Sequence, residues 1–197
     1  PESDTADELL TLAALCTNCT AAPDGKPMGD PTETALVRAC RENLPELAAR
    51  CPRVGEIPFT SERKRMSVVV RYGKAYRIIC KGAPEIILAH CTKVLQNGRV
   101  AAMTPALKNR LLSLNRSMAN EALRVLAVAV RDVPSVPHED QAAESDLLFC
   151  GLIAMEDPPR REVKKAVAQC LRAGIRPVMI TGDNGATAAA IARQVGI

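Results

Sequence analysis

Apolar residues in the first 156 positions fall mostly into short runs that turn residues interrupt, a pattern typical of β-strands. Gly73 separates two of these runs and Asn97-Gly98 separates two others, so each pair predicts an antiparallel hairpin. The predicted strands are 54–58, 66–72, 75–80, 92–95, 99–103, 123–130 and 147–155. Together they predict a largely antiparallel sheet.

Helical signals lie between these strands. Closely spaced leucines predict a helix over 9–15. Asp30 stands before a proline with Glu33 at the third helical position, which predicts a helix start, and that helix is expected to run to about residue 41. Further helices are predicted after Pro84 and from Thr104. The first part of the chain therefore belongs to the α+β class, with helices flanking a sheet.

The pattern changes after the last of these strands. Two adjacent prolines within 157–160 predict a stiff linker. Apolar residues at helical spacing over 163–171 predict a helix that Gly174 ends. A buried strand is predicted over 176–180, and another helix after Gly185. This end of the chain therefore reads as the start of a parallel α/β unit.

Composition narrows the classes of partner. Lys plus Arg number 26 and Asp plus Glu 22, a net charge of +4, and aromatic residues make up 2% of the chain. Nucleic-acid binders usually concentrate basic charge and offer aromatic stacking platforms, so no nucleic-acid partner is expected. The sequence has no apolar run of the roughly 20 residues that cross a bilayer, and its polar, acidic start is unlike a secretory signal. We expect a soluble piece that makes no membrane contact of its own.

Eight cysteines occur in the chain. Cys80 and Cys170 lie within apolar patterns, which favours reduced, buried thiols in a cytosolic protein. Cys16 and Cys19 form one C-x-x-C pair, but no second pair or suitably spaced histidine completes a zinc site. No complete metal site is expected.

Thr181, Gly182 and Asp183 follow the predicted strand 176–180 and open a helix. Ligands of α/β folds bind at the carboxyl ends of strands, and the free N–H groups of a helix start favour an anion. A hydroxyl, a glycine and a carboxylate there suit phosphate or phosphate-bound Mg²⁺. A tight turn with an aspartate cap accounts equally well for these residues taken alone.

Two further segments suit a nucleotide. Lys81-Gly82 ends a predicted strand, where the glycine would let a ligand approach the backbone. Phe59 stands beside a basic cluster that contains Lys64, a combination that suits an adenine ring and phosphates. Taken singly, these residues are better explained as ordinary turns, with Phe59 in the core.

Glu33 and Arg124 have two interpretations each. Glu33 is suited to accept a hydrogen bond from the exocyclic amine of a ligand, or to serve as the glutamate of a capping box, and both roles can coexist. Arg124 suits a phosphate or is the polar member of an alternating strand. The order and spacing of all these motifs carry more information than any one of them. The ordered segments are 29–36, 59–67, 81–85, 123–127, 157–160 and 181–184.

This ordered set resembles the cytoplasmic region of P-type cation-transporting ATPases, in the branch that contains calcium, sodium/potassium and proton pumps. The resemblance spans nearly the whole chain. It implies a nucleotide-binding domain over 1–156, a twisted antiparallel sheet flanked by helices, and over 157–197 a hinge with part of a haloacid-dehalogenase-like phosphorylation domain. Periodicity would pair 147–155 with 176–180 in one βαβ unit, whereas the family places 147–155 in the first domain, and we follow the family.

The resemblance also implies residue roles. Phe59 would stack on adenine and Glu33 contact its amino edge, while Lys64, Lys81 and Gly82 line the pocket. Arg124 would approach the phosphates. Asp157, Pro158, Pro159 and Arg160 would form the hinge, and Thr181, Gly182 and Asp183 the phosphate side of the second domain. Animal calcium pumps carry an arginine two residues after the stacking phenylalanine, where this chain has Ser61, so Arg63 or Lys64 would substitute or nucleotide would bind more weakly.

The implied function is ATP binding within an ATP-driven cation pump at the cytoplasmic face of a membrane, with calcium favoured by the overall resemblance. ATP, Mg²⁺ and the rest of the pump, namely its membrane, actuator and remaining phosphorylation segments, are the implied partners. The family's phosphorylated aspartate lies in Asp-Lys-Thr-Gly-Thr, which this sequence lacks, so no catalytic residue is expected here and the chain alone is expected to be inactive. The alternatives are a stand-alone nucleotide-sensing module and a haloacid-dehalogenase-type phosphatase fragment.

Overall fold

The computed structural model describes residues 2–137, 143–156, 159–180 and 185–197. The chain divides into two compact units. The first comprises Pro1–Lys108 and Leu126–Ile153, and the second comprises Asn109–Val125 and Ala154–Ile197.

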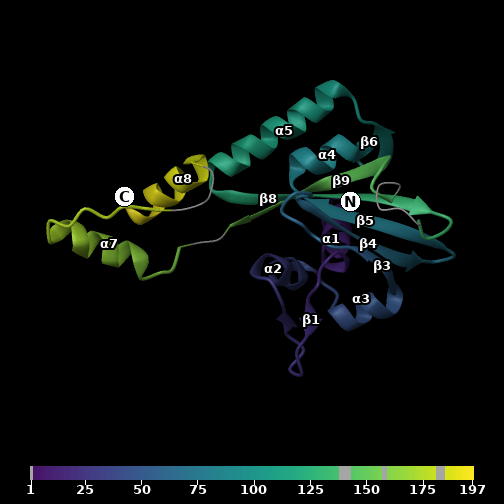
Figure 1. Cartoon of the computed structure of the whole chain (residues 1–197), viewed down its shortest axis with the longest axis horizontal. Helices are drawn as coiled ribbons and strands as arrows, with labels where there is room; N and C mark the ends of the chain where they lie inside the picture. Colours follow the sequence, from purple (N-terminus) through teal and green to yellow (C-terminus); the bar gives the residue numbers. More distant parts are fainter. Residues whose placement is uncertain (1, 138–142, 157–158, 181–184) are drawn as a thin grey trace. The chain divides into compact units, whose positions relative to one another are not determined.

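A seven-stranded sheet forms the centre of the first unit, in the order β3-β4-β5-β8-β9-β6-β7 (Figure 1). Every predicted strand up to residue 156 is present in it. Their bounds are β3 Arg53–Ile57, β4 Arg65–Tyr72, β5 Ala75–Gly82, β6 Cys91–Gln96, β7 Arg99–Ala102, β8 Leu123–Val133 and β9 Leu147–Glu156. A separate pair, β1 Thr20–Ala21 and β2 Pro27–Met28, closes a loop for which no strands were predicted.

The sheet is mostly antiparallel, as predicted. β3 with β4, β4 with β5, β5 with β8 and β6 with β7 are antiparallel pairs, while β6 and β9 run parallel. Both predicted hairpin turns are present, with positive φ at Gly73 (61°), Asn97 (49°) and Gly98 (74°). β9 lies beside β8 and β6 in this sheet, so the βαβ pairing with 176–180 suggested by periodicity was wrong.

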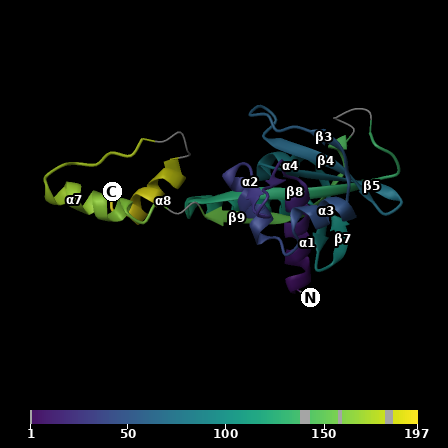
Figure 2. The same cartoon turned by 90° about the horizontal axis from the view of Figure 1, so that it is seen from below.

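Helices cover both faces of the sheet, which explains why β4 is buried at every position from Met66 to Val70. Helices α1 (Glu2–Leu15), α2 (Pro31–Ala39) and α3 (Leu44–Arg50) lie on one side, and α4 (Pro84–His90) lies on the other (Figure 1). The view from below keeps α1, α2 and α3 together (Figure 2). From opposite faces, α1 and α4 both contact β5.

Local signals explain where α2 and α3 begin. Asp30 accepts hydrogen bonds from the N–H groups of Thr32 (2.8 Å) and Glu33 (3.4 Å), which confirms the predicted helix start. α3 was not predicted, although Asn43 caps it by accepting from the N–H of Glu46 at 3.0 Å. Only one apolar side chain of α3, Leu47, is fully buried, so its hydrophobic periodicity is weak.

In the second unit, α7 (Val163–Arg172) and α8 (Gly185–Val195) contact each other and match two predicted helices. Gly174 ends the α7 segment at φ 77°, as predicted. Residues 176–180, however, form no strand, so this prediction was wrong. A strand needs a hydrogen-bonding neighbour, and the described residues supply none here. Val178 is accordingly 74% and Ile180 94% exposed.

The remaining helix, α5 (Pro105–Asn120), begins where Thr104-Pro105 predicted it, with Thr104 accepting from the N–H of Leu107 at 3.2 Å. No described helix combines the length and the apolar composition that a bilayer crossing requires.

Candidate functional site

Glu33 and Lys81, two of the residues predicted from separate motifs, form a buried ion pair. Lys81 Nζ donates to Glu33 Oε1 at 3.0 Å, and the two side chains are 6% and 15% exposed. They are 48 residues apart, on α2 and β5 respectively. A shielded lysine beside a shielded carboxylate offers both signs of charge at one point, which suits a ligand with an anionic part and a hydrogen-bond donor.

Both side chains are placed by backbone structure. Glu33 lies in the first turn of α2, which Asp30 caps, and its Oε2 accepts from the N–H of Asn18 at 2.8 Å. Lys81 lies opposite Met66 in the β4–β5 hairpin and opposite Val128 on β8. A central strand and a capped helix are rigid supports, so the pair is held in place before any ligand arrives.

Gly82 brings β5 against the turn that contains Lys64. A Cβ atom added at Gly82 would lie 2.4 Å from the Lys64 carbonyl oxygen and 2.6 Å from the Arg65 Cβ. The N–H of Ala83 donates to that same carbonyl at 3.0 Å. Glycine was predicted here to admit a ligand, and the structure gives it a second reason, because the chain's own backbone passes through that space. The ligand contact of Gly82 stays a prediction.

Phe59 begins a tight turn that ends at Lys64. The N–H of Lys64 donates to the carbonyl of Thr60 at 2.8 Å, and Lys64 adopts a left-handed φ of 53°. Phe59 is 58% exposed, although the residue taken singly suggested core packing. An exposed aromatic ring on a closed turn is available to a planar ligand. Lys64 is also exposed, and it directly precedes Arg65, which pairs with Gly82 in the β4–β5 register.

Arg63 is held inside this turn. Its guanidinium donates to the Pro58 carbonyl at 2.6 Å and to the carboxylate of Glu144. Since Arg63 is held in this way, Lys64 is the better placed of the two cations to reach a ligand beside Ser61.

Glu144 contacts the basic cluster beside this turn, and the sequence did not reveal it. Its carboxylate is 2% exposed and accepts from Arg65 Nε at 2.7 Å, from Ser67 Oγ at 2.7 Å and from Arg63. Burial by itself would raise the pKa of Glu144, but these three donors outweigh burial and lower it from its ordinary value. The basic cluster 63–65 suggested a nearby negative charge, but nothing local indicated a carboxylate 79 or more positions away.

The remaining predicted residues belong to the second compact unit or lie outside the described part of the chain. Arg124 is exposed on β8 within the second unit. Pro159 and Arg160 precede α7, and the Arg160 carbonyl accepts from the N–H of Val163 at 3.0 Å. The other hinge and phosphate-side residues lie outside the described part of the chain: Asp157, Pro158, Thr181, Gly182 and Asp183. Their roles stay predictions.

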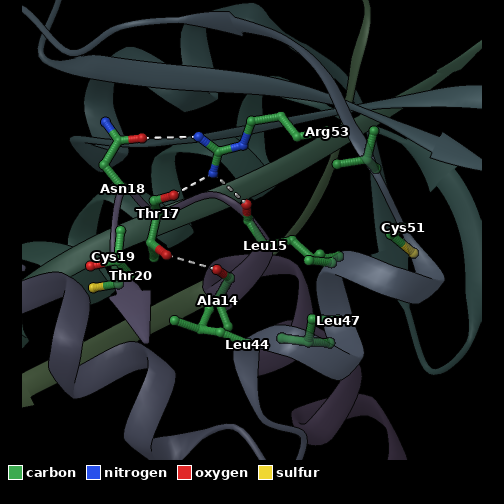
Figure 3. Close-up of a pocket in the computed structure, with 12 residues that line it drawn as sticks. Ala14, Leu15, Thr17, Asn18, Cys19, Thr20, Leu44, Leu47, Cys51 and Arg53 are labelled. Carbon is green, nitrogen blue, oxygen red and sulfur yellow. Dashed lines mark hydrogen bonds between the residues drawn. The ribbon is translucent and has the colours of Figure 1, made fainter. Parts of the chain in front are cut away.

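A cavity of about 320 Å³ adjoins the site between α1, α3 and β3 (Figure 3). Its described lining includes Asn18 but not Glu33, Phe59 or Lys81. Arg53 crosses its rim, donating to Asn18 Oδ1 at 2.9 Å and to the carbonyls of Leu15 and Thr17. Because these polar groups already bond one another, they hold the loop that carries Asn18. The cavity therefore offers few free donors to a polar ligand.

Metal and thiol chemistry find little support among the described residues. No group of three or more His, Cys, Asp or Glu side chains there is arranged to hold a metal ion. All eight cysteines are free thiols. Burial raises the pKa of Cys16 to about 11 and that of Cys80 to about 12, so neither forms a reactive thiolate near neutral pH.

Comparison with known proteins gives matches to one family. The family model described as P-type ATPase, cytoplasmic domain N, matches residues 5–162. "Calcium-transporting ATPase 1" of Bacillus cereus is 42% identical over 192 residues, 96% of this chain and 22% of that protein. "Calcium-transporting ATPase 1" of Lactococcus lactis is 39% identical over 193 residues, with the same shares of both chains. "Calcium-transporting ATPase 3, endoplasmic reticulum-type" of Arabidopsis thaliana is 42% identical over 146 residues, 71% of this chain and 14% of that protein. The chain thus spans about a fifth of the length of its bacterial relatives.

Proposed function

This chain belongs to the P-type ATPase family, in which it matches cytoplasmic domain N, and from this premise we propose that it binds ATP through the site around Glu33, Phe59 and Lys81. The observation that carries the proposal is the buried Glu33–Lys81 pair, which joins two motifs 48 residues apart beside the turn of Phe59. In this proposal the adenine ring lies on Phe59, and its amino group donates to Glu33. Lys81 has three N–H donors, so it can bind the nucleotide while it remains paired with Glu33.

The polyphosphate side of the proposed site is basic and exposed. Animal calcium pumps carry an arginine where this chain has Ser61, and Lys64 would approach the phosphates in place of that arginine. Arg124 would contact the phosphates from β8. Surface cations of this kind contribute modest, salt-dependent attraction, whereas stacking on an exposed ring is insensitive to salt. We therefore expect base recognition to supply most of the affinity.

Replacing Phe59 with alanine is expected to weaken ATP binding by about 1–3 kcal/mol, a 5- to 150-fold rise in Kd, because the stacking surface is lost. The fold should survive, since the ring is 58% exposed. An NMR titration with ATP measures the Kd and checks folding in the same spectra.

Tyr72→Ala is the matched control. Tyr72 is also an exposed aromatic residue, at 47%, but it lies at the β4–β5 hairpin turn beneath Arg77. We expect its removal to leave the ATP Kd unchanged. An equal loss in both variants, or none in Phe59→Ala, would remove Phe59 from the proposed site.

The chain is further proposed to act within a longer ATP-driven cation pump, with calcium the favoured ion because its relatives carry that name. Residues 157–197 would then be the hinge and part of a phosphorylation domain. The exposed Val178 and Ile180 support this, since they would pair with further strands in a larger sheet. Mg²⁺ and the phosphorylated aspartate would act in the assembled pump, which this proposal places at the cytoplasmic face of a membrane.

Incubation of the isolated chain with γ-labelled ATP and Mg²⁺ is expected to give neither labelled protein nor sustained release of phosphate. Phosphoryl transfer needs an in-line nucleophile and a metal that bridges the phosphates, and the family's Asp-Lys-Thr-Gly-Thr motif is absent from this sequence. Asp183→Asn is the control for a hidden nucleophile. An acid-stable phosphoprotein that Asp183→Asn abolishes would overturn the expectation.

A further inference from the structure

Glu144 is the most deeply buried carboxylate among the described residues, at 2% exposed, and the proposed ATP contacts do not include it. It lies in the segment that leads into β9, far along the sequence from its partners. Its three donors, Arg63, Arg65 and Ser67, are 77–81 positions away. The carboxylate therefore ties the segment before β9 to the start of β4.

Arg63 links this carboxylate to the residue before Phe59. One guanidinium nitrogen of Arg63 donates to Glu144, and another donates to the Pro58 carbonyl at 2.6 Å. The N–H of Arg63 also donates to Thr60 Oγ1 at 3.1 Å. The position of Glu144 thus sets where both ends of the Phe59 turn lie.

Arg65 makes the second link, to the other side of the turn. Its Nε donates to Glu144 at 2.7 Å, and it pairs with Gly82 in the β4–β5 register. Lys64 lies between Arg63 and Arg65 and takes its left-handed conformation there. One buried carboxylate thereby fixes the two arginines that flank Lys64.

We propose that Glu144 is a positioning residue for nucleotide binding, which holds the turn 58–65 so that Phe59 and Lys64 are presented to the ligand. This inference rests on the proposed ATP site. A turn that is already ordered loses less conformational freedom when a ligand binds, so a preorganised turn binds more tightly. The competing explanation is that Glu144 contributes to stability alone, which predicts that the affinity of the folded protein is independent of it.

A double-mutant cycle separates the two explanations. Glu144→Gln keeps the shape of the side chain but removes the charge that attracts both arginines. In the otherwise unchanged chain we expect this substitution to raise the ATP Kd about 3- to 10-fold, the usual effect of ordering one or two side chains on binding. In the Phe59→Ala background the same substitution is expected to raise the Kd less than about 2-fold, because the ring that it positions is gone.

Asp132→Asn is the matched control. It removes a carboxylate that also binds an arginine, Arg77, through two hydrogen bonds of 2.6 and 2.8 Å. That pair lies at the other end of β5 from Gly82, so the ATP Kd should stay constant. All titrations are followed by NMR with ATP itself, at a temperature at which the spectra show every variant fully folded.

The outcomes are distinct. A rise of Kd in Glu144→Gln that disappears in the Phe59→Ala background supports the inference. An unchanged Kd in Glu144→Gln, while Phe59→Ala still weakens binding, overturns the inference and leaves the ATP site in place. If the unchanged chain fails to bind ATP, or Phe59→Ala binds as tightly, the proposed site and the inference fall together.

Should Glu144→Gln fail to fold, Ser67→Ala takes its place in the cycle. Ser67 donates to the same carboxylate at 2.7 Å, so its loss loosens Glu144 without removing the charge. The expected rise in Kd is then about 2-fold, again only when Phe59 is present. An unchanged Kd in a folded Ser67→Ala variant would count against the inference.

Discussion

Lys81→Met is expected to lower the free energy of unfolding by about 3–4 kcal/mol, the lower part of the range for breaking a buried ion pair from one side. Lys81 is 6% exposed and its partner Glu33 is 15% exposed. Methionine fills a similar volume, so the loss comes from the carboxylate that is left buried without its cation, not from a cavity. Urea denaturation at neutral pH measures the effect.

Two further variants show whether the unpaired charge is the cause. Glu33→Gln/Lys81→Met removes both charges and is expected to recover part of the stability that Lys81→Met loses. Lys93→Met breaks a pair with Asp146 in which the two side chains are 49% and 50% exposed, and it is expected to cost far less stability than Lys81→Met. If the double variant is as unstable as Lys81→Met, or Lys93→Met costs as much, the buried-charge explanation fails.

Glu144→Ala is expected to lower the free energy of unfolding by about 3 kcal/mol at neutral pH, because it leaves two partly buried guanidinium groups without their shared carboxylate. Arg63 and Arg65 are 24% and 16% exposed, so each recovers only part of its hydration. Asp132→Ala, which removes a 57% exposed partner of Arg77, should cost less than about 1 kcal/mol. Urea denaturation of the three proteins provides the comparison.

The cost of Glu144→Ala should depend on pH in one direction. The pKa of Glu144 is lower in the folded chain than its ordinary value of 4.5, so its charge stabilises the fold fully above that value and progressively less as the pH falls through the folded pKa. Nearby His90 has a pKa lowered by burial and then by Arg65. The stability difference between the unchanged chain and Glu144→Ala should therefore shrink in acid, and a constant difference down to about pH 3 would contradict this.

These two buried charge clusters involve, or adjoin, residues of the proposed nucleotide site. The Glu33–Lys81 pair supplies groups that would touch the ligand, whereas Glu144 and its arginines shape the turn that presents Phe59. Functional sites often combine groups that contact the ligand with a supporting layer that fixes them. The stability variants above and the ATP titrations test these two layers separately.

Much of the local structure was fixed by short-range signals that the sequence carries in full. Asn97-Gly98 specified its hairpin because these two residues tolerate positive φ, and Asp30 specified the start of α2 because its side chain caps the helix. The ordered motifs also identified the family, and with it the residues Glu33 and Lys81 that the fold brings together.

Tertiary structure alone decided which distant residues meet and which apolar segments are covered. Residues 176–180 have the composition of a buried strand, yet Val178 and Ile180 are exposed, because burial depends on neighbours that a local pattern does not contain. Glu144 likewise gave no signal, since its carboxylate is buried through Arg63 and Arg65, which lie 81 and 79 positions away in the sequence. Backbone preferences act over a few residues, whereas ion pairs and sheet contacts join positions tens of residues apart, so the latter are set by the fold as a whole.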